Sequence, residues 1–280
     1  MEQTDYQPLI HMALHEDLAA DGDVTSRALF DDETMEARLF AKDIGILAGA
    51  RIFSAVFSAV DPETRVELLA SDGALLAPDE HVATVRGRAV SVLSAERVAL
   101  NFLSHLSGIA TGARRYTEEA ARGGNAVILD TRKTLPGYRK VAKYAVRVGG
   151  AQNHRIGLYD MVLLKDNHID RAGSITTAVE RVRAKWGTRF SIEVECRTLD
   201  HVREARALEV ERILLDNMSL DEMREAVTLC DGAVELEASG NIDLARVCEV
   251  SATGVDFISV GGLTHSVAAF DFSLKTWMTV

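Results

Sequence analysis

The sequence has few cysteines and no excess of positive charge, and both features exclude classes of protein. Cys196, Cys230 and Cys248 show no CxxC spacing, so we expect buried, reduced thiols in a cytoplasmic protein. The formal net charge is −11. A nucleic-acid-binding protein normally needs a basic face, so we expect no nucleic-acid partner.

Long apolar runs and linker sequences are also missing. No run approaches the roughly 20 apolar residues of a membrane helix, so no membrane contact is expected. The first residues, MEQTDYQPLI, lack the basic and apolar regions of a signal peptide. No Ser/Pro-rich stretch divides the 280 residues, which suit one large α/β domain or two closely packed ones.

The second half of the chain contains a repeated pattern of strand and helix. Six short apolar runs begin at Ala126, Met161, Phe190, Arg212, Val234 and Asp256. Helical patterns separate the later runs, and residues 241–250 form the last one. This alternation predicts a parallel sheet, and six units favour a β/α barrel over an open sheet. Six strands are fewer than eight, so either the barrel is incomplete or strands are hidden.

The first half predicts a separate α+β domain. Its patterns include a helix over residues 6–18 and a strand pair that turns at Arg86-Gly87-Arg88. A long helix is expected from Ser94, with Ser94 as its N-cap, and it joins this domain to the barrel at about Gly108.

Polar residues follow every strand of the predicted barrel, which is where barrel enzymes place their catalytic groups. The six strand ends are Asp130–Lys133, Lys165–Asn167, Glu195, Asp216–Asn217, Ala238–Asn241 and Gly261–His265. A helix cap explains any single end, but six that converge on one face predict an active site.

The last two strand ends have the features of phosphate sites. Ser239-Gly240-Asn241 is expected to open a helix, whose free N–H groups attract anions. Gly261-Gly262 allows the backbone to approach an anion closely. The alternative is that Ser239 serves only as an N-cap.

Glu195 and Asp216 end adjacent predicted strands. With phosphate sites nearby, we expect them to bind Mg²⁺, partly through water. The alternative is that they form ordinary salt bridges with Arg197 and Lys165.

Positive charge is concentrated between Arg132 and His168 in this otherwise acidic chain. Arg132, Lys133, His154, Arg155 and Lys165 lie at or near strand ends, where they suit carboxylate or phosphate groups. By contrast, Arg139, Lys143 and Arg147 share one helix face and are expected to be solvated. Arg97 lies on the long helix, in a polar stripe with Asn101.

Several of these segments resemble the quinolinate phosphoribosyltransferase family. The matching motifs are HEDLAADGDVTS, SAERVALNFLSHLSGIAT, DTRKTLPGYRKVAKYAV, NHRIGLYDMVLLKDNHI, IEVE, LLDN, LEASG and VGGLTHS. They extend from about His15 to Lys275. The chain departs from the family pattern at Ala151, Asn241 and Gly262.

The resemblance implies a pentosyltransferase, the carboxylating nicotinate-nucleotide pyrophosphorylase of NAD biosynthesis. Such an enzyme joins quinolinate to 5-phosphoribosyl 1-pyrophosphate with Mg²⁺, and yields nicotinate mononucleotide, pyrophosphate and CO₂. The implied fold is an N-terminal α/β sandwich domain over 1–108, joined by 268–280, and an incomplete, seven-stranded β/α barrel over 109–267. The implied assembly is a cytoplasmic homodimer, with a hexameric trimer of dimers as a further option.

The resemblance also implies which residues bind quinolinate. By motif position, Arg132, His154, Arg155 and Lys165 bind its two carboxylates. Arg97 reaches the same site from the neighbouring subunit.

The remaining motif positions imply the site of the second substrate. Lys133 lies at the pyrophosphate, while Glu195 and Asp216 organise Mg²⁺ and the ribose. Ser239-Gly240 and Gly261-Gly262 hold the 5-phosphate. The expected catalytic residues are Lys133, Lys165, Glu195 and Asp216.

Four alternatives remain open. A nicotinate-specific relative needs fewer cations than this chain has, and a molybdenum-transport-associated paralogue is expected to have altered arginines and lysines. A non-catalytic phospho-ligand binding protein need not keep Glu195 and Asp216. A Schiff-base aldolase would use Lys165 as its nucleophile.

Overall fold

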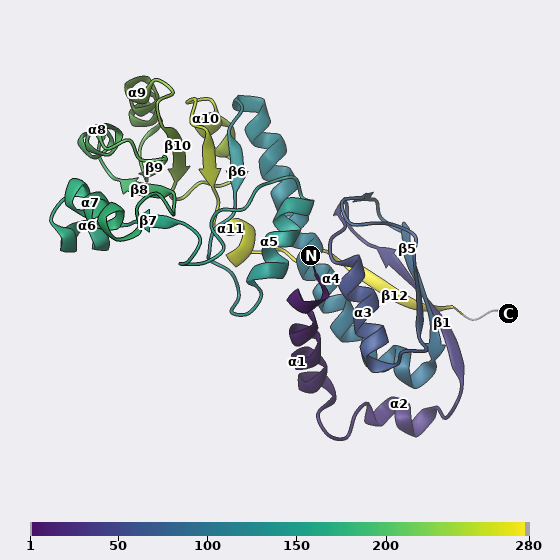
Figure 1. The fold of residues 1–280 in the computed structure, drawn as a ribbon. Helices are drawn as coiled ribbons and strands as arrows, with labels where there is room; N and C mark the ends of the chain where they lie inside the picture. Colours follow the sequence, from purple (N-terminus) through teal and green to yellow (C-terminus); the bar gives the residue numbers. More distant parts are fainter. Residues whose placement is uncertain (1, 278–280) are drawn as a thin grey trace. The chain divides into compact units, whose positions relative to one another are not determined.

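The structure is a computed structural model that describes residues 2–277, and the chain forms two compact units (Figure 1). The first unit contains the residues up to 114, residues 134–150 and the residues from 266 onward. The second contains residues 115–133 and 151–265. Residues 278–280 of the expected 268–280 segment lie outside the described residues.

The first unit is built on an antiparallel sheet in the order β12-β1-β5-β3. Its strands are β1 (Thr34–Ala41), β3 (Arg65–Leu68), β5 (His81–Arg88) and β12 (Phe272–Trp277), with a separate pair of β2 (Gly45–Ile46) and β4 (Leu75–Leu76). Its helical elements are η1 (Gln3–Asp5), α1 (Gln7–Leu18), α2 (Val24–Leu29), α3 (Ala50–Val60), the first part of α4 (Ala89–Gly123) and α5 (Arg139–Val148). The pairing of β12 with β1 returns the C-terminal segment to this unit.

The second unit is built on a six-stranded parallel sheet in the order β6-β11-β10-β9-β8-β7. Its strands are β6 (Val127–Leu129), β7 (Val162–Leu164), β8 (Ile192–Cys196), β9 (Arg212–Asp216), β10 (Glu235–Ser239) and β11 (Phe257–Ser259). The helices are α6 (Asp166–Ala172), α7 (Ile175–Trp186), α8 (Leu199–Ala207), α9 (Leu220–Cys230), α10 (Val247–Ser251) and α11 (Gly262–His265). The side chains of Ser174, Thr198 and Ser219 cap α7, α8 and α9, since each accepts a backbone N–H of the first turn.

The parallel sheet follows the predicted strand–helix alternation. Within residues 2–277 no ladder joins its first strand, β6, to its second, β7. Gln152 makes only an isolated parallel bridge to Leu129 of β6. The chain between Gln152 and β7 is a loop, in which Asp160 accepts the backbone N–H groups of Ile156 and Gly157.

Two expectations for the first unit are wrong. Arg86-Gly87-Arg88 is not a turn, because β5 runs straight through it and pairs with β1 and β3. A Cβ at residue 87 would lie 2.7 Å from Oγ1 of Thr64, so the glycine is required by close packing instead. The long helix begins at Ala89 rather than at Ser94, and Ser94 is buried within it.

Segment 134–150 belongs to the first unit, although the sequence-based division placed it in the barrel. The hydroxyl of Tyr144 in α5 donates to Asp72 at 2.6 Å, and the Tyr138 ring stacks on Phe102. Lys143 of α5 is only 1% exposed. The expectation of a solvated face with Arg139 and Arg147 is therefore wrong for Lys143.

Candidate active site

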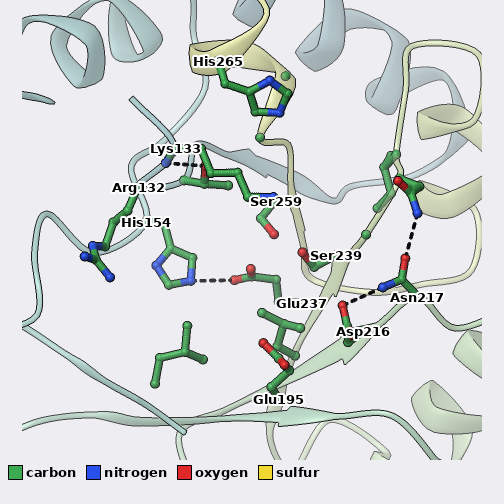
Figure 2. A pocket seen from close by; sticks show the side chains of 18 of the residues that line it. Arg132, Lys133, His154, Glu195, Asp216, Asn217, Glu237, Ser239, Ser259 and His265 are labelled. Carbon is green, nitrogen blue, oxygen red and sulfur yellow. Dashed lines mark hydrogen bonds and ion pairs between the residues drawn. The ribbon is translucent and has the colours of Figure 1, made fainter. Parts of the chain in front are cut away.

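A cavity of about 890 Å³ lies at the carboxyl ends of the parallel strands of the second unit (Figure 2). Most of the predicted site residues line it: Arg132, Lys133, His154, Arg155, Lys165, Glu195, Asp216, Ser239, Gly240, Gly261 and Gly262. The parallel sheet thus gathers at one place six strand ends that are far apart in the sequence.

Strand register determines which side chains face the cavity. Glu195 of β8 is aligned with Leu214 of β9, which is aligned with Glu237 of β10. Asp216 and Ser239 are aligned in the next layer toward the strand ends. Since residues two apart in a strand point to the same face, these five side chains form two layers of the cavity wall.

Two arginines lie near each other at this cavity. Arg155 is half-buried, and its Nη1 donates to the carbonyl oxygen of Met161 at 3.1 Å. Burial, and then the nearby positive charge of Arg132, lower the pKa of Arg155. An anion bound beside both guanidinium groups would relieve this repulsion, so the geometry favours an anionic ligand here.

Lys165 and Glu195 form an ion pair inside the cavity. Nζ of Lys165 lies 3.0 Å from Oε2 of Glu195, and the Lys165 side chain is 48% exposed. Arg197 pairs with Asp166 instead of with either predicted carboxylate. Of the two expected salt bridges, the one between Lys165 and Glu195 is therefore present, whereas Arg197 pairs with a different carboxylate.

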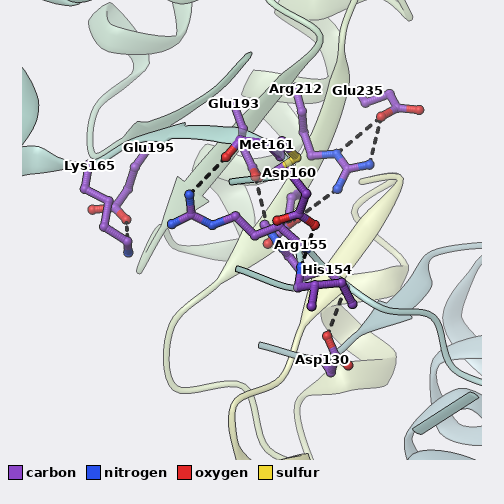
Figure 3. A network of polar contacts seen from close by, with 12 residues as sticks. Asp130, His154, Arg155, Asp160, Met161, Lys165, Glu193, Glu195, Arg212 and Glu235 are labelled. Carbon is purple, nitrogen blue, oxygen red and sulfur yellow. Dashed lines mark hydrogen bonds and ion pairs between the residues drawn. The ribbon is translucent and has the colours of Figure 1, made fainter. Parts of the chain in front are cut away.

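His154 lines the cavity and lies close to two buried carboxylates, Glu237 (Figure 2) and Glu193 (Figure 3). The backbone N–H of Arg155 donates to Nδ1 of His154 at 2.7 Å. Nδ1 therefore carries the lone pair, and the imidazole proton is on Nε2. Nε2 lies 3.0 Å from Oε2 of Glu193 and 3.4 Å from Oε2 of Glu237.

The same three residues have the composition of a metal site, and their potential ligand atoms lie within 4.8 Å of one another. A metal would need the lone pair of Nε2, but the contact of Arg155 with Nδ1 places a proton there. We therefore interpret the cluster as a polar floor and not as a metal centre.

Glu237 is fully buried at this floor. Burial, and then the negative charge of Glu193, raise its pKa to about 7. His154, a hydrogen bond with Ser259 and then Arg212 limit this rise of the pKa. Nη1 of Arg212 lies 3.3 Å from Oε2 of Glu237, and its guanidinium lies over the ring of Phe257.

The loop after β10 differs from the prediction. The expected helix from Asn241 begins only at Val247. Before it, the Asp243 side chain accepts the N–H groups of Ala245 and Arg246, which forms a local turn. The prediction that Ser239 opens a helix is wrong, so a phosphate at this loop would not meet a helix N-terminus.

The loop after β11 brings two basic side chains together. A Cβ at residue 261 would lie 3.1 Å both from Cδ of Lys133 and from Nε2 of His265. Oγ1 of Thr264 donates to the carbonyl oxygen of Lys133 at 2.8 Å, which ties this loop to the one after β6. Gly261 therefore permits a close approach of the backbone to the side chains of Lys133 and His265, as an anion site requires.

Sequence reasoning missed the buried floor and part of the lining. Glu193 and Glu237 were not singled out, and neither was Tyr116, which lines the cavity with Glu237. The signal for Glu193 was its place in IEVE, where acidic residues alternate within an otherwise apolar strand. A charge at such a position has to face a polar interior.

Arg97 does not line the cavity in this single chain, and its side chain is exposed on α4 in the first unit.

All three cysteines are free, with Cys196 and Cys230 buried. Among the described residues, no helix has the length and apolar character needed to cross a membrane.

Comparison with known proteins identifies both units. Residues 23–107 match the family model "Quinolinate phosphoribosyl transferase, N-terminal domain", and residues 109–275 match its C-terminal domain. A probable carboxylating nicotinate-nucleotide pyrophosphorylase of Bacillus subtilis is 42% identical, with 100% of this chain and 96% of that protein covered. NadC from Streptococcus pyogenes has a TM-score of 0.94 at 40% identity, with 98% of this chain and 97% of that one covered. The nicotinate-nucleotide pyrophosphorylase of Francisella tularensis has a TM-score of 0.95 at 36% identity, with 99% and 98% covered.

Proposed function

The chain belongs to the quinolinate phosphoribosyl transferase family, and we propose how the residues of its cavity carry out that family's reaction. The enzyme transfers the phosphoribosyl group of 5-phosphoribosyl 1-pyrophosphate to quinolinate. It forms nicotinate mononucleotide, pyrophosphate and CO₂ in NAD biosynthesis. The observation that carries the residue assignment is the pair of neighbouring arginines, Arg132 and Arg155, on a cavity that also contains Glu195 and Asp216.

Quinolinate binds at the arginine wall in this proposal. Arg132, Arg155 and Lys165 provide three positive charges for its two carboxylates, and planar guanidinium groups suit bidentate contact. His154 belongs to the same site. Because both of its ring nitrogens face protein groups, it supports the site by fixing the backbone of Arg155.

Mg²⁺ fits the neighbouring carboxylates, Glu195 and Asp216. Glu195 and Asp216 supply hard oxygen ligands from adjacent strands, and Asp216 forms no salt bridge within residues 2–277. When bound, Mg²⁺ would neutralise negative charge on the departing pyrophosphate. The same carboxylates favour the positive charge that develops on the ribose carbon.

The phosphates bind at the loops that follow β10, β11 and β6. Ser239-Gly240 and Gly261-Gly262 accommodate the 5-phosphate through backbone groups. Lys133, which lies over Gly261, attracts the pyrophosphate. Much of the rate enhancement then comes from holding two anionic substrates in a reactive orientation.

Loss of CO₂ needs no further cofactor in this scheme. Once the ring nitrogen carries the ribose it is positively charged, and it accepts the electron pair of the bond to the adjacent carboxylate.

Lys165 does not act as a Schiff-base nucleophile, because it is half exposed and ion-paired with Glu195, whereas that chemistry needs a desolvated, neutral lysine.

The proposal also covers the oligomeric state, the number of barrel strands and the cellular compartment. The enzyme is a cytoplasmic homodimer, or a trimer of such dimers, in which Arg97 of each chain enters the site of the neighbour. The barrel counts the short segment at Gln152 as its seventh strand, and the boundary between the two domains in the sequence lies near Gly108. Free thiols at all three cysteines support a reducing compartment.

Kinetics of matched variants test the residue assignment. Arg132→Ala should raise the KM for quinolinate at least tenfold while the KM for phosphoribosyl pyrophosphate stays within about threefold. Arg171→Ala removes an exposed positive charge outside the cavity and should behave as wild type. An unchanged KM for quinolinate in Arg132→Ala would remove Arg132 from the carboxylate site.

A further inference from the structure

Two asparagine side chains form a hydrogen-bonded chain that ends at Asp216 (Figure 2). Nδ2 of Asn217 donates to Oδ1 of Asp216 at 2.9 Å, and Nδ2 of Asn241 donates to Oδ1 of Asn217 at 3.1 Å. The direction of this chain is fixed at one end, because an ionised carboxylate can only accept. The amide nitrogen of Asn217 must therefore face Asp216, and its oxygen must face a donor, which Asn241 supplies.

The backbone holds both amides in place. Asn217 has φ 54° and Asn241 has φ 49°, in the left-handed region that Asn tolerates better than most residues. The N–H of Asn217 donates to the carbonyl oxygen of Ser239 at 2.9 Å. Gly240 has φ 101°, and a Cβ there would overlap the Asn217 amide. A glycine is thus needed both for its own conformation and for the position of Asn217.

The two carboxylates, Asp216 and Glu195, are held by different kinds of partner. Glu195 is held by Lys165 at 3.0 Å, whereas no Lys, Arg or His nitrogen of the described chain forms an ion pair with Asp216. Within residues 2–277, its carboxylate accepts one side-chain hydrogen bond, which Asn217 donates to Oδ1, so that Oδ2 is left for a ligand. Rotation of this carboxylate is therefore controlled by Asn217.

We propose that Asn217 and Asn241 are positioning residues that orient the carboxylate of Asp216 toward the Mg²⁺-bound phosphoribosyl substrate, and that Asn241 acts only through Asn217. The inference rests on the proposed role of Asp216. It assigns to Asn241 a part in the affinity for phosphoribosyl pyrophosphate and none in the affinity for quinolinate.

Glycine substitutions provide a clean test, because glycine keeps the left-handed backbone at both positions and changes no charge. The variants are Asn217→Gly, Asn241→Gly and the double variant. Asn125→Gly, at an exposed position outside the cavity, is the matched control. For each, calorimetry measures the Kd of phosphoribosyl pyrophosphate with Mg²⁺, and steady-state kinetics measures both KM values.

The expected result is a tenfold or greater loss of affinity for phosphoribosyl pyrophosphate in Asn217→Gly and about a threefold loss in Asn241→Gly. The double variant should match Asn217→Gly, because removing the second amide has no effect once the first is gone. The KM for quinolinate and the melting temperature should stay at the control's values.

An Asn241→Gly variant with wild-type affinity would overturn the proposal. So would losses that multiply in the double variant, since these indicate that each residue contacts the substrate independently. Calorimetry measures binding of phosphoribosyl pyrophosphate whether or not the protein turns over quinolinate. A wild-type protein that makes no product from quinolinate would refute the proposed function, while the binding cycle would still decide the role of the two asparagines.

Discussion

Nζ of Lys165 lies 3.0 Å from Oε2 of Glu195, so a cation assigned to quinolinate is ion-paired with a carboxylate assigned to Mg²⁺. Under the proposed assignment, the two substrate sites therefore share a boundary. Any ligand that engages one partner changes the charge that the other partner experiences, so this pair connects the proposed quinolinate site to the proposed Mg²⁺ site.

Glu195→Gln tests this connection. The variant should lower kcat by about 10²-fold, because a fixed negative charge opposite the developing positive ribose is lost. It should raise the KM for phosphoribosyl pyrophosphate but not that for quinolinate, since Lys165 becomes fully available. Glu249→Gln, at an exposed position, is the kinetic control. A larger rise in the KM for quinolinate than in that for phosphoribosyl pyrophosphate would contradict the assignment.

Arg155→Lys tests the geometry of the carboxylate grip. Lysine keeps the charge but loses the planar pair of donors and the contact with the Met161 carbonyl. We expect the KM for quinolinate to rise by about tenfold or more, with little change for phosphoribosyl pyrophosphate. Arg197→Lys, outside the cavity, should leave both values unchanged. Equal changes in both KM values for Arg155→Lys would argue for a general electrostatic role instead.

Glu237→Gln tests the polar floor through the pH dependence of stability. The pKa of Glu237 is raised to about 7 from an ordinary 4.5, so the folded protein holds this proton more tightly than the unfolded chain. Its contribution to stability is therefore complete below pH 4.5 and is lost as the pH rises toward 7. Between pH 5 and pH 8, the wild type should lose up to about 3 kcal/mol of unfolding free energy relative to the variant.

Urea unfolding at several pH values measures this difference. Glu235→Gln, on the same strand but exposed, is the control for the loss of a carboxylate from β10. A gap between wild type and Glu237→Gln that stays constant from pH 5 to pH 8 would show that Glu237 is ionised throughout.

Gly123→Ala tests a close contact in the second unit. A Cβ at the end of α4 would overlap the carbonyl group of Cys248 in α10 and lie 3.2 Å from the backbone nitrogen of Ala252. Because backbone atoms cannot move aside easily, we expect a loss of about 2 kcal/mol or more in unfolding free energy. Ala121→Ser, an exposed position on the same helix, should change it by less than about 0.5 kcal/mol. Equal melting temperatures for the two variants would contradict this packing.

The parallel sheet was predictable because its strands are apolar runs and its helices carry local start signals. The Ser219–Glu222 pair is one such signal, and it forms a capping box at the start of α9. Local signals failed where tertiary packing decides. The sequence around Gly87 is typical of a turn, but the glycine serves close packing against Thr64 inside a continuous strand.

For the site, the sequence predicted which strand ends meet, since that follows from topology alone. The predicted residues other than Arg97 line one cavity. The sequence did not reveal which site side chains lie beside one another, because that depends on the register between neighbouring strands. Glu237 lies at the level of Glu195 only through the intervening Leu214, and no local pattern contains that alignment. The helix expected from Asn241 failed because Asp243 forms a competing turn.

The most direct measurement of the central claim follows the products of the wild-type protein with phosphoribosyl pyrophosphate, Mg²⁺ and either quinolinate or nicotinic acid. We predict one nicotinate mononucleotide and one CO₂ for each quinolinate consumed, no nucleotide from nicotinic acid, and loss of turnover when Mg²⁺ is chelated. Absence of nucleotide from quinolinate, with the protein folded and Mg²⁺ present, would contradict the account, and so would equal turnover of nicotinic acid.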